Sequence, residues 1–183
     1  AQFSLATFHE LVLGNPGYMD LIRSDMFTQR TYYMGMVDAR NRVSFCDGKV
    51  RVVDPAGSEF AKFDAQDYEE HIEERSEEWT YSKFPFLRKV GWKGFTDGKD
   101  NGAYRVGPLG RLNAAEGMAT PLANKEYQEL FSLLGRPVHS TLAFHWARLI
   151  ELLYAAGRAV ELASDPEITS PDVRNMPGEP GRG

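Results

Sequence analysis

Cysteine is nearly absent from this chain: Cys46 is the only one among 183 residues. A single cysteine cannot form an internal disulfide, and it excludes a metal site made of several thiolates from this chain alone. Such sparing use of cysteine is typical of proteins in a reducing compartment, so we expect a cytoplasmic protein.

Long apolar runs and basic clusters are also missing. No apolar stretch approaches the roughly 20 residues that cross a bilayer, and the first residues lack the pattern of a signal peptide, so we expect no membrane span. The formal net charge is -5, and no group of Lys and Arg with interleaved aromatics overrides it. These features argue against a nucleic-acid partner.

What the sequence does contain suits one globular domain. Apolar residues make up 42% of the chain and aromatics 12%, which is enough to build a core. We expect a single domain over residues 1–175 and a flexible tail over 176–183, where glycine and proline dominate. The chain opens without a methionine and inside a helical pattern, so we expect it to be a piece excised from a longer protein.

The longest regular pattern lies between Gly135 and Pro166 and predicts a helix in the C-terminal half of the chain. Its apolar residues recur at intervals of three and four, which places them on one face of a helix. They are Leu142, Trp146, Leu149, Leu153, Ala156 and Val160. We predict an α+β fold that is mainly helical and is organised around this long helix.

A change of period predicts a small antiparallel meander of three or four short strands over residues 31–63, after a helical start over 1–26. Asp47 and Gly48 favour a two-residue hairpin turn between strands 43–46 and 49–53. Farther along, we expect a helix over 64–78, an irregular segment over 79–119 and a helical hairpin over 120–164; these last three ranges complete the predicted domain.

The residues alone predict no complete catalytic site, and we assign no residue to catalysis, to a cofactor or to a metal. His139 and His145 are six residues apart, which would turn them to different faces of a helix rather than make them a metal pair. His145, Arg148 and Glu151 are successive i, i+3 neighbours and could form a polar row. That row would be either a partly buried salt bridge or the lining of a proton or ligand path.

Five segments carry distinctive motifs. They read RTYYMGMVD (30–38), WTYSKFPF (79–86), GAYRVGPLGRLN (102–113), VHSTLAFHWARLIE (138–151) and DPEITSPDVR (165–174). In this order and spacing they resemble the central part of the large subunit of nickel-iron hydrogenases, most of all the cytoplasmic branch linked to heterodisulfide reductase, deazaflavin or NAD.

The resemblance implies an oxidoreductase that reversibly oxidises molecular hydrogen at a nickel-iron centre and passes electrons to a partner, an iron-sulfur small subunit. In that family two C-x-x-C motifs hold the metal, and neither is present here. The resemblance therefore implies that this chain is a central scaffold fragment without cofactors of its own. It would be inactive alone, would pack against the N- and C-terminal parts of the same large subunit, and could self-associate. The alternative is a non-catalytic hydrogenase-like assembly or interaction protein.

Charged residues within the resembling segments are the candidates for supporting a cofactor or the contact between lobes. The simpler interpretation is that they form ordinary buried ion pairs. They are Lys83, Arg105, Arg111, His145, Arg148 and Glu151.

Overall fold

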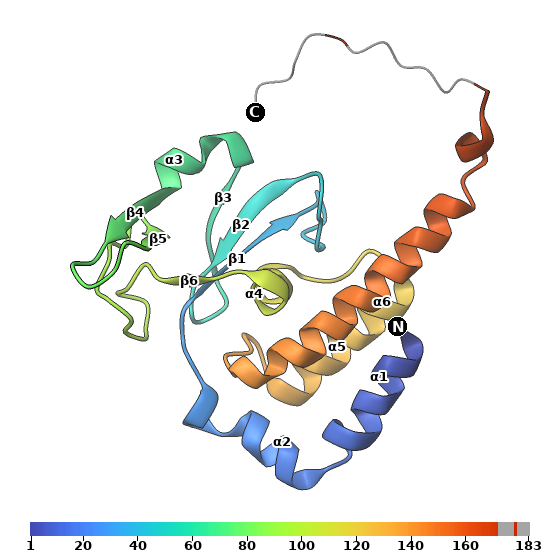
Figure 1. Ribbon diagram of the computed structural model, residues 1–183, viewed down its shortest axis with the longest axis horizontal. Coiled ribbons are helices and arrows are strands. Elements are labelled where there is room, and N and C mark those ends of the chain that lie inside the picture. Colours follow the sequence, from blue (N-terminus) through green and yellow to red (C-terminus); the bar gives the residue numbers. More distant parts are fainter. Residues whose placement is uncertain (172–177, 179–183) are drawn as a thin grey trace.

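A computed structural model describes residues 1–171 and 178. Helices and two small sheets form an α+β fold with a long helix in the C-terminal half, which confirms the predicted class (Figure 1). The predicted tail, 176–183, lies outside the described residues except for Gly178. No helix within the described part is long and apolar enough to cross a membrane.

Helices α1, α2, α5 and α6 gather on one side of the molecule, and α4 lies between them and the larger sheet, whereas the short α3 lies apart beside β4 (Figure 1). The α-helices are α1 (Gln2–Phe8), α2 (Pro16–Arg23), α3 (Tyr68–His71), α4 (Gly107–Ala114), α5 (Pro121–Leu134) and α6 (Phe144–Ala163). A π-helical turn (His9–Leu13) follows α1, and 3-10 turns cover Asp25–Phe27, Ala65–Asp67, Thr141–Ala143 and Pro166–Thr169.

Helix α6 forms the centre of the main core because α1, α4 and α5 all pack against it. Its buried residues are Trp146, Ala147, Ile150 and Leu153. The predicted stripe is therefore correct at Trp146 and Leu153 but wrong at Val160, which is 67% exposed. The apolar spacing continues along the helix, whereas the elements that cover it do not.

The strands are β1 (Tyr32–Val37), β2 (Lys49–Val53), β3 (Glu59–Phe63), β4 (Ile72–Ser76), β5 (Lys83–Leu87) and β6 (Tyr104–Arg105). One sheet has the order β3-β2-β1-β6, in which the first three strands are antiparallel and β6 is parallel to β1. The predicted hairpin at Asp47 and Gly48 is wrong, because Lys49 begins β2 opposite Val37 of β1. A Cβ at Gly48 would lie 2.1 Å from the Val37 carbonyl oxygen, so the absence of a side chain here allows the backbone to pack closely against β1.

The predicted helix over 64–78 is wrong beyond His71. Residues 72–76 instead form β4, which pairs with β5 in a separate two-stranded sheet. Ile72 lies opposite the buried Leu87 and packs on a second core beneath the larger sheet. Pairing with the next strand, β5, has overridden a local pattern that suits a helix equally well.

The predicted irregular segment over 79–119 is also wrong in part, since it contains β5, β6 and α4. Helix α4 begins at Gly107, whose φ of +74° favours glycine, and Pro108 occupies the first turn. Five of its eight residues are buried, because it is wedged between β1 and α6. Gly102 and Gly110 in this stretch permit close packing, because a Cβ on them would lie 2.7 and 2.5 Å from a backbone carbonyl oxygen.

Candidate functional site

The six charged candidates fall into four separate places. Arg111 of α4 and Glu151 of α6 meet each other, and Arg105 of β6 meets the segment that precedes α6. His145 and Arg148 line an apolar groove at the start of α6. Lys83 lies exposed at the start of β5, and its side chain makes no hydrogen bond or ion pair with any residue that the structure describes.

Arg111 and Glu151 form a bidentate ion pair between α4 and α6. The guanidinium Nε donates to Oε1 at 2.6 Å and Nη2 donates to Oε2 at 2.7 Å. The two side chains are 28% and 11% exposed, and the ring of Phe45 lies 5.1 Å from the guanidinium carbon. Two parallel hydrogen bonds fix both direction and distance, so this pair holds α4 in register on α6.

Glycine at position 35 allows this pair to form. A Cβ on Gly35 of β1 would lie 2.7 Å from the Cα of Arg111. Only a residue without a side chain therefore lets α4 approach the sheet this closely. The position of Arg111 is set by the sheet on one side and by Glu151 on the other.

A second polar cluster surrounds the fully buried Tyr33 of β1. Its hydroxyl lies 2.5 Å from Nδ1 of His139 and 3.2 Å from the carbonyl oxygen of Val138. Arg105 donates to the carbonyl oxygen of His139 at 3.0 Å, and its guanidinium carbon lies 6.0 Å from the Tyr33 ring centre. Polar contacts thus join β1, the short strand β6 and the segment before α6.

Burial dominates the electrostatics of this cluster. It raises the pKa of the Tyr33 hydroxyl, keeping the phenol protonated. It also lowers the pKa of His139 below the ordinary 6.5, and the nearby guanidinium groups of Arg30 and Arg105 add to that effect. The imidazole is therefore held neutral, which suits a hydrogen-bonding role more than a charged one.

Asn113, in the buried face of α4, fixes the same segment from the other side. Its side-chain amide donates to the Val138 carbonyl at 2.9 Å and accepts from the Val138 amide at 2.9 Å. The Asn113 side chain thus satisfies both the N–H and the C=O of Val138, as the backbone of a neighbouring strand would do. The chain therefore enters α6 in one defined position, next to the cis peptide between Arg136 and Pro137.

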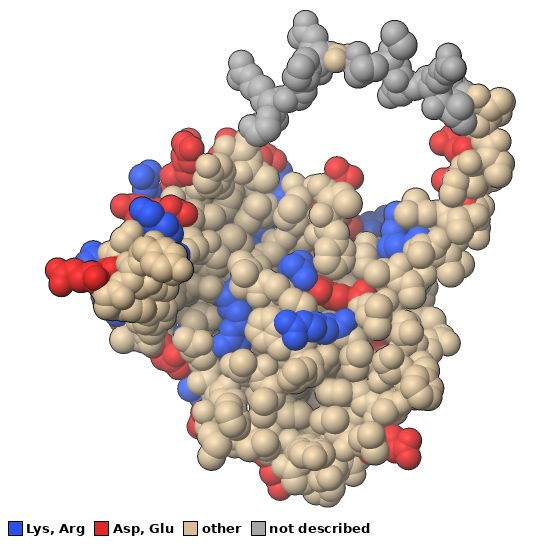
Figure 2. All heavy atoms as spheres, viewed as in Figure 1, with Lys and Arg blue, Asp and Glu red and all other residues tan. Residues whose placement is uncertain are grey.

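The predicted polar row along α6 does not form. Glu151 turns to Arg111, while Arg148 lies 5.9 Å from the ring centre of Phe144, and His145 is exposed. Both line a groove of about 640 Å³ whose other lining residues are apolar. These are Phe8, Val12, Tyr18, Leu21, Ile22, Leu142 and Leu149. Figure 2 shows that the surface of the molecule around the start of α6 carries few charges.

The residues that complete these clusters were not predicted from the sequence. Tyr33 and Asn113 were not among the candidates, and His139 was considered but given no role. Asn113 did leave a signal, because an amide inside an otherwise apolar helix must find partners once it is buried. Tyr33 left none, since its partners are 105 and 106 residues away along the chain.

The cofactor chemistry that this chain can support is limited. An iron-sulfur cluster takes four thiolates or a mixture of thiolates and imidazoles, and this chain offers only the exposed Cys46. Its residues therefore do not fit such a cluster.

In the described part of the chain, one group of possible metal ligands converges: His9, Glu126 and Glu129.

Comparison with known proteins identifies the class. No protein-family model matches the chain. The chain is similar to one hydrogenase subunit over 97% of its length and to another over 74%, and hydrogenases are oxidoreductases. A solved structure of an NAD+-reducing [NiFe]-hydrogenase in the H2-reduced state shares this fold with a TM-score of 0.79 and 27% identity over 97% of the chain.

Two relatives give more particular names. An iron-sulfur subunit of the F420-non-reducing hydrogenase of Archaeoglobus profundus is 42% identical over 179 residues, 97% of this chain. The beta subunit of the NAD-reducing hydrogenase HoxS of Cupriavidus necator is 37% identical over 136 residues, 74% of this chain. The chain spans 37% of the length of the first relative, 26% of the second and 37% of the solved chain.

These names correct the type of subunit that the sequence motifs suggested. The prediction of a nickel-iron large catalytic subunit is wrong, because the relative with 42% identity is itself named an iron-sulfur subunit. The predicted partner, a separate iron-sulfur small subunit, is wrong with it, and so are the other partners predicted for a large-subunit fragment. The alternative of a non-catalytic assembly protein is likewise unsupported, because the similar proteins are named as hydrogenase subunits. The motifs in this chain contain scaffold residues and no cofactor ligand. Such motifs cannot distinguish one type of hydrogenase subunit from another.

Proposed function

We propose that this chain is part of an iron-sulfur type subunit of a hydrogenase complex, an oxidoreductase that acts on hydrogen. The observation that carries the proposal is the 42% identity, over 97% of the chain, to a protein of that type. The common fold with a solved hydrogenase chain supports it, since 27% identity accompanies a TM-score of 0.79. Cluster ligands would have to come from outside these 183 residues, because Cys46 alone cannot supply them.

Within such a subunit, we propose that Arg111 and Glu151 position helices rather than take part in chemistry. Their oxygen and nitrogen atoms satisfy each other at 2.6 and 2.7 Å, and the pair joins α4 to α6. Arg105 would serve the same purpose at the entry to α6, where it binds the His139 carbonyl. Lys83, which is exposed on another sheet, would have no such role.

The test uses the assembled complex that contains this chain, purified through an affinity tag on the subunit. We expect hydrogen-dependent reduction of a viologen dye to copurify with the tag, and iron-sulfur signals in the electron paramagnetic resonance spectrum of the reduced subunit. A purified subunit without iron, or a complex without hydrogen-dependent activity, would contradict the proposal.

Two variants test the positioning role in the same complex. Arg111→Met should reduce the yield of assembled complex while the activity per assembled complex is retained, because the pair holds the fold. Lys83→Met is the matched control and should leave both quantities unchanged. Normal assembly of Arg111→Met together with a large fall in activity per complex would instead place Arg111 in the reaction.

A further inference from the structure

Three side chains converge where the turn after α1 meets α5. Nε2 of His9 lies 3.0 Å from Oε2 of Glu126, and its Nδ1 lies 3.8 Å from Oε1 of Glu129. One possible ligand atom from each of the three residues lies within 4.8 Å of the other two. His9 comes from a segment 117 residues away from Glu126 in the sequence, so the fold itself brings these groups together.

The surroundings of the cluster orient two of the three side chains. Glu126 is only 9% exposed, and its Oε2 also accepts a hydrogen bond from the indole Nε1 of Trp146 at 3.2 Å. The His9 ring stands edge-on to the Trp146 ring, with centroids 5.9 Å apart at 86°. Metal-binding carboxylates and imidazoles are commonly held in this way by a second layer of contacts. His9 is also the first residue of the π-helical turn, a feature frequent at functional sites.

From this geometry we infer that His9, Glu126 and Glu129 form a binding site for one divalent first-row transition metal ion, with zinc as the probe. Two ligand atoms that bind zinc tetrahedrally at about 2.0–2.1 Å are separated by roughly 3.3 Å. The 3.0 Å between His9 and Glu126 needs an opening of only a few tenths of an ångström. Glu129, whose side chain is 38% exposed, can turn inward to complete three protein ligands, and water would supply the fourth.

The choice of ligand atoms selects the class of ion. One imidazole nitrogen with two carboxylate oxygens favours zinc or ferrous iron, whereas magnesium and calcium prefer oxygen alone. An adjoining cavity of about 260 Å³, lined by His9, Glu126 and Lys125 among others, gives a path from solvent. The bound ion would clip the N-terminal helical segment to α5.

The experiment titrates the metal-free 183-residue chain with zinc by calorimetry, and with cobalt by visible absorption. We expect one equivalent to bind, with the absorption bands of a four-coordinate cobalt site. With free zinc at about 100 times the dissociation constant, the thermal midpoint should rise by about 5–10 °C. The inference concerns this chain alone and stands independently of the proposed function.

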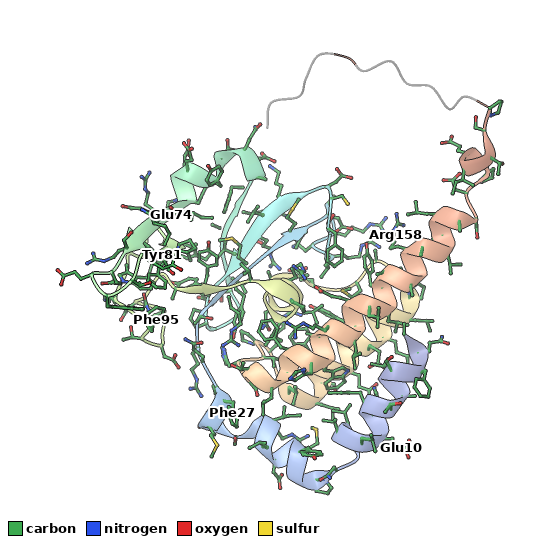
Figure 3. The ribbon with its side chains drawn as sticks, in the orientation of Figure 1. Glu10, Phe27, Glu74, Tyr81, Phe95 and Arg158 are labelled. Atoms are coloured by element: carbon green, nitrogen blue, oxygen red, sulfur yellow. The ribbon has the colours of Figure 1, made fainter. Side chains whose placement is uncertain are left out.

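Matched variants distinguish this site from adventitious binding. His9→Gln and Glu129→Gln should each weaken zinc binding roughly tenfold or more. His145→Gln removes an exposed imidazole elsewhere and should bind like the unchanged chain. Glu10→Gln removes a carboxylate from the same π-helical turn, on the outer side of the molecule (Figure 3), and should also bind normally.

Two results would overturn the inference. One is the absence of binding by the unchanged chain at millimolar zinc. The other is equal binding by the unchanged chain and His9→Gln or Glu129→Gln, which would place the ion elsewhere. Glu129 is partly exposed, so its variant should fold normally, and thermal unfolding in a chelator checks this.

Discussion

The two halves of α6 have the same apolar spacing but opposite environments. In the first half, residues 144–153, Trp146 and Ile150 are 1% and 0% exposed. In the second half, residues 154–163, Val160 and Leu162 are 67% and 55% exposed. The second half extends beyond the rest of the helical layer, and Arg158 marks it in Figure 3.

The contrast shows that periodicity specifies the apolar face of a helix but not how far along it a neighbour reaches. Helices α1, α4 and α5 cover the first half, and the start of α5 ends that cover near Gly157. A Cβ on Gly157 would lie 3.1 Å from a methyl carbon of Thr120, the residue before α5. Stability should therefore depend on the first half of α6 and hardly on the second.

The largest effect should come from Ile150→Ala. The side chain is fully buried, and its removal should lower the free energy of unfolding by about 2–5 kcal/mol through lost burial and the cavity left behind. Urea unfolding followed by circular dichroism measures this. A loss below about 1 kcal/mol would show that the core around α6 is looser than the packing implies.

A smaller effect is expected in the coupling energy of the ion pairs, which should differ between the two halves of α6. A double-mutant cycle on Arg111 and Glu151, using Arg111→Met and Glu151→Gln, should give a coupling energy of about 1–3 kcal/mol. The matched cycle on Arg158 and Glu161, an exposed i, i+3 pair of the second half, should give less than about 0.5 kcal/mol. Equal coupling in the two cycles would refute the contrast between the halves.

The sequence predicts the parts of this fold that are determined locally. The long helix, with Trp146 and Leu153 facing inward, follows from spacing alone, as do the first three strands of the sheet. Strand β4 does not, because residues 72–76 become a strand only by pairing with residues 83–87. Gly48 likewise suits a hairpin locally, and only the position of Val37 shows what it accommodates.

The candidate site was predictable to a lesser degree, for the same reason. Arg111 and Glu151 were chosen from motifs, but their pairing depends on the packing of two helices, because the partners are 40 positions apart in sequence. The row His145, Arg148 and Glu151 assumed that neighbours on one helix pair with each other. Glu151 instead satisfies a planar, two-pronged guanidinium on the facing helix, which offers better geometry than an exposed i, i+3 neighbour.

The pH dependence of stability tests the segment that leads into the first half of α6. Burial lowers the pKa of His139 in the folded chain below its ordinary 6.5, so the unfolded chain binds a proton more readily. The stability that the neutral imidazole provides is complete above pH 6.5 and is lost as the pH falls toward the lowered value. Urea midpoints between about pH 5 and pH 7.5 should therefore rise with pH, and this slope should decrease in His139→Gln. An unchanged slope in the variant would assign the dependence to other groups.

The smallest effect should come from Val160→Ser in the second half of α6. Val160 occupies a position of the apolar stripe, so a sequence-based argument would place it in the core and predict a large loss. It is 67% exposed, and substitutions at exposed sites usually change stability by less than about 0.5 kcal/mol. Serine and valine differ in helix propensity by no more than a few tenths of a kcal/mol, so propensity does not obscure the result. A loss comparable to that of Ile150→Ala, measured by the same urea unfolding, would mean that the second half of α6 is covered in solution, because only burial gives an aliphatic side chain so large an effect.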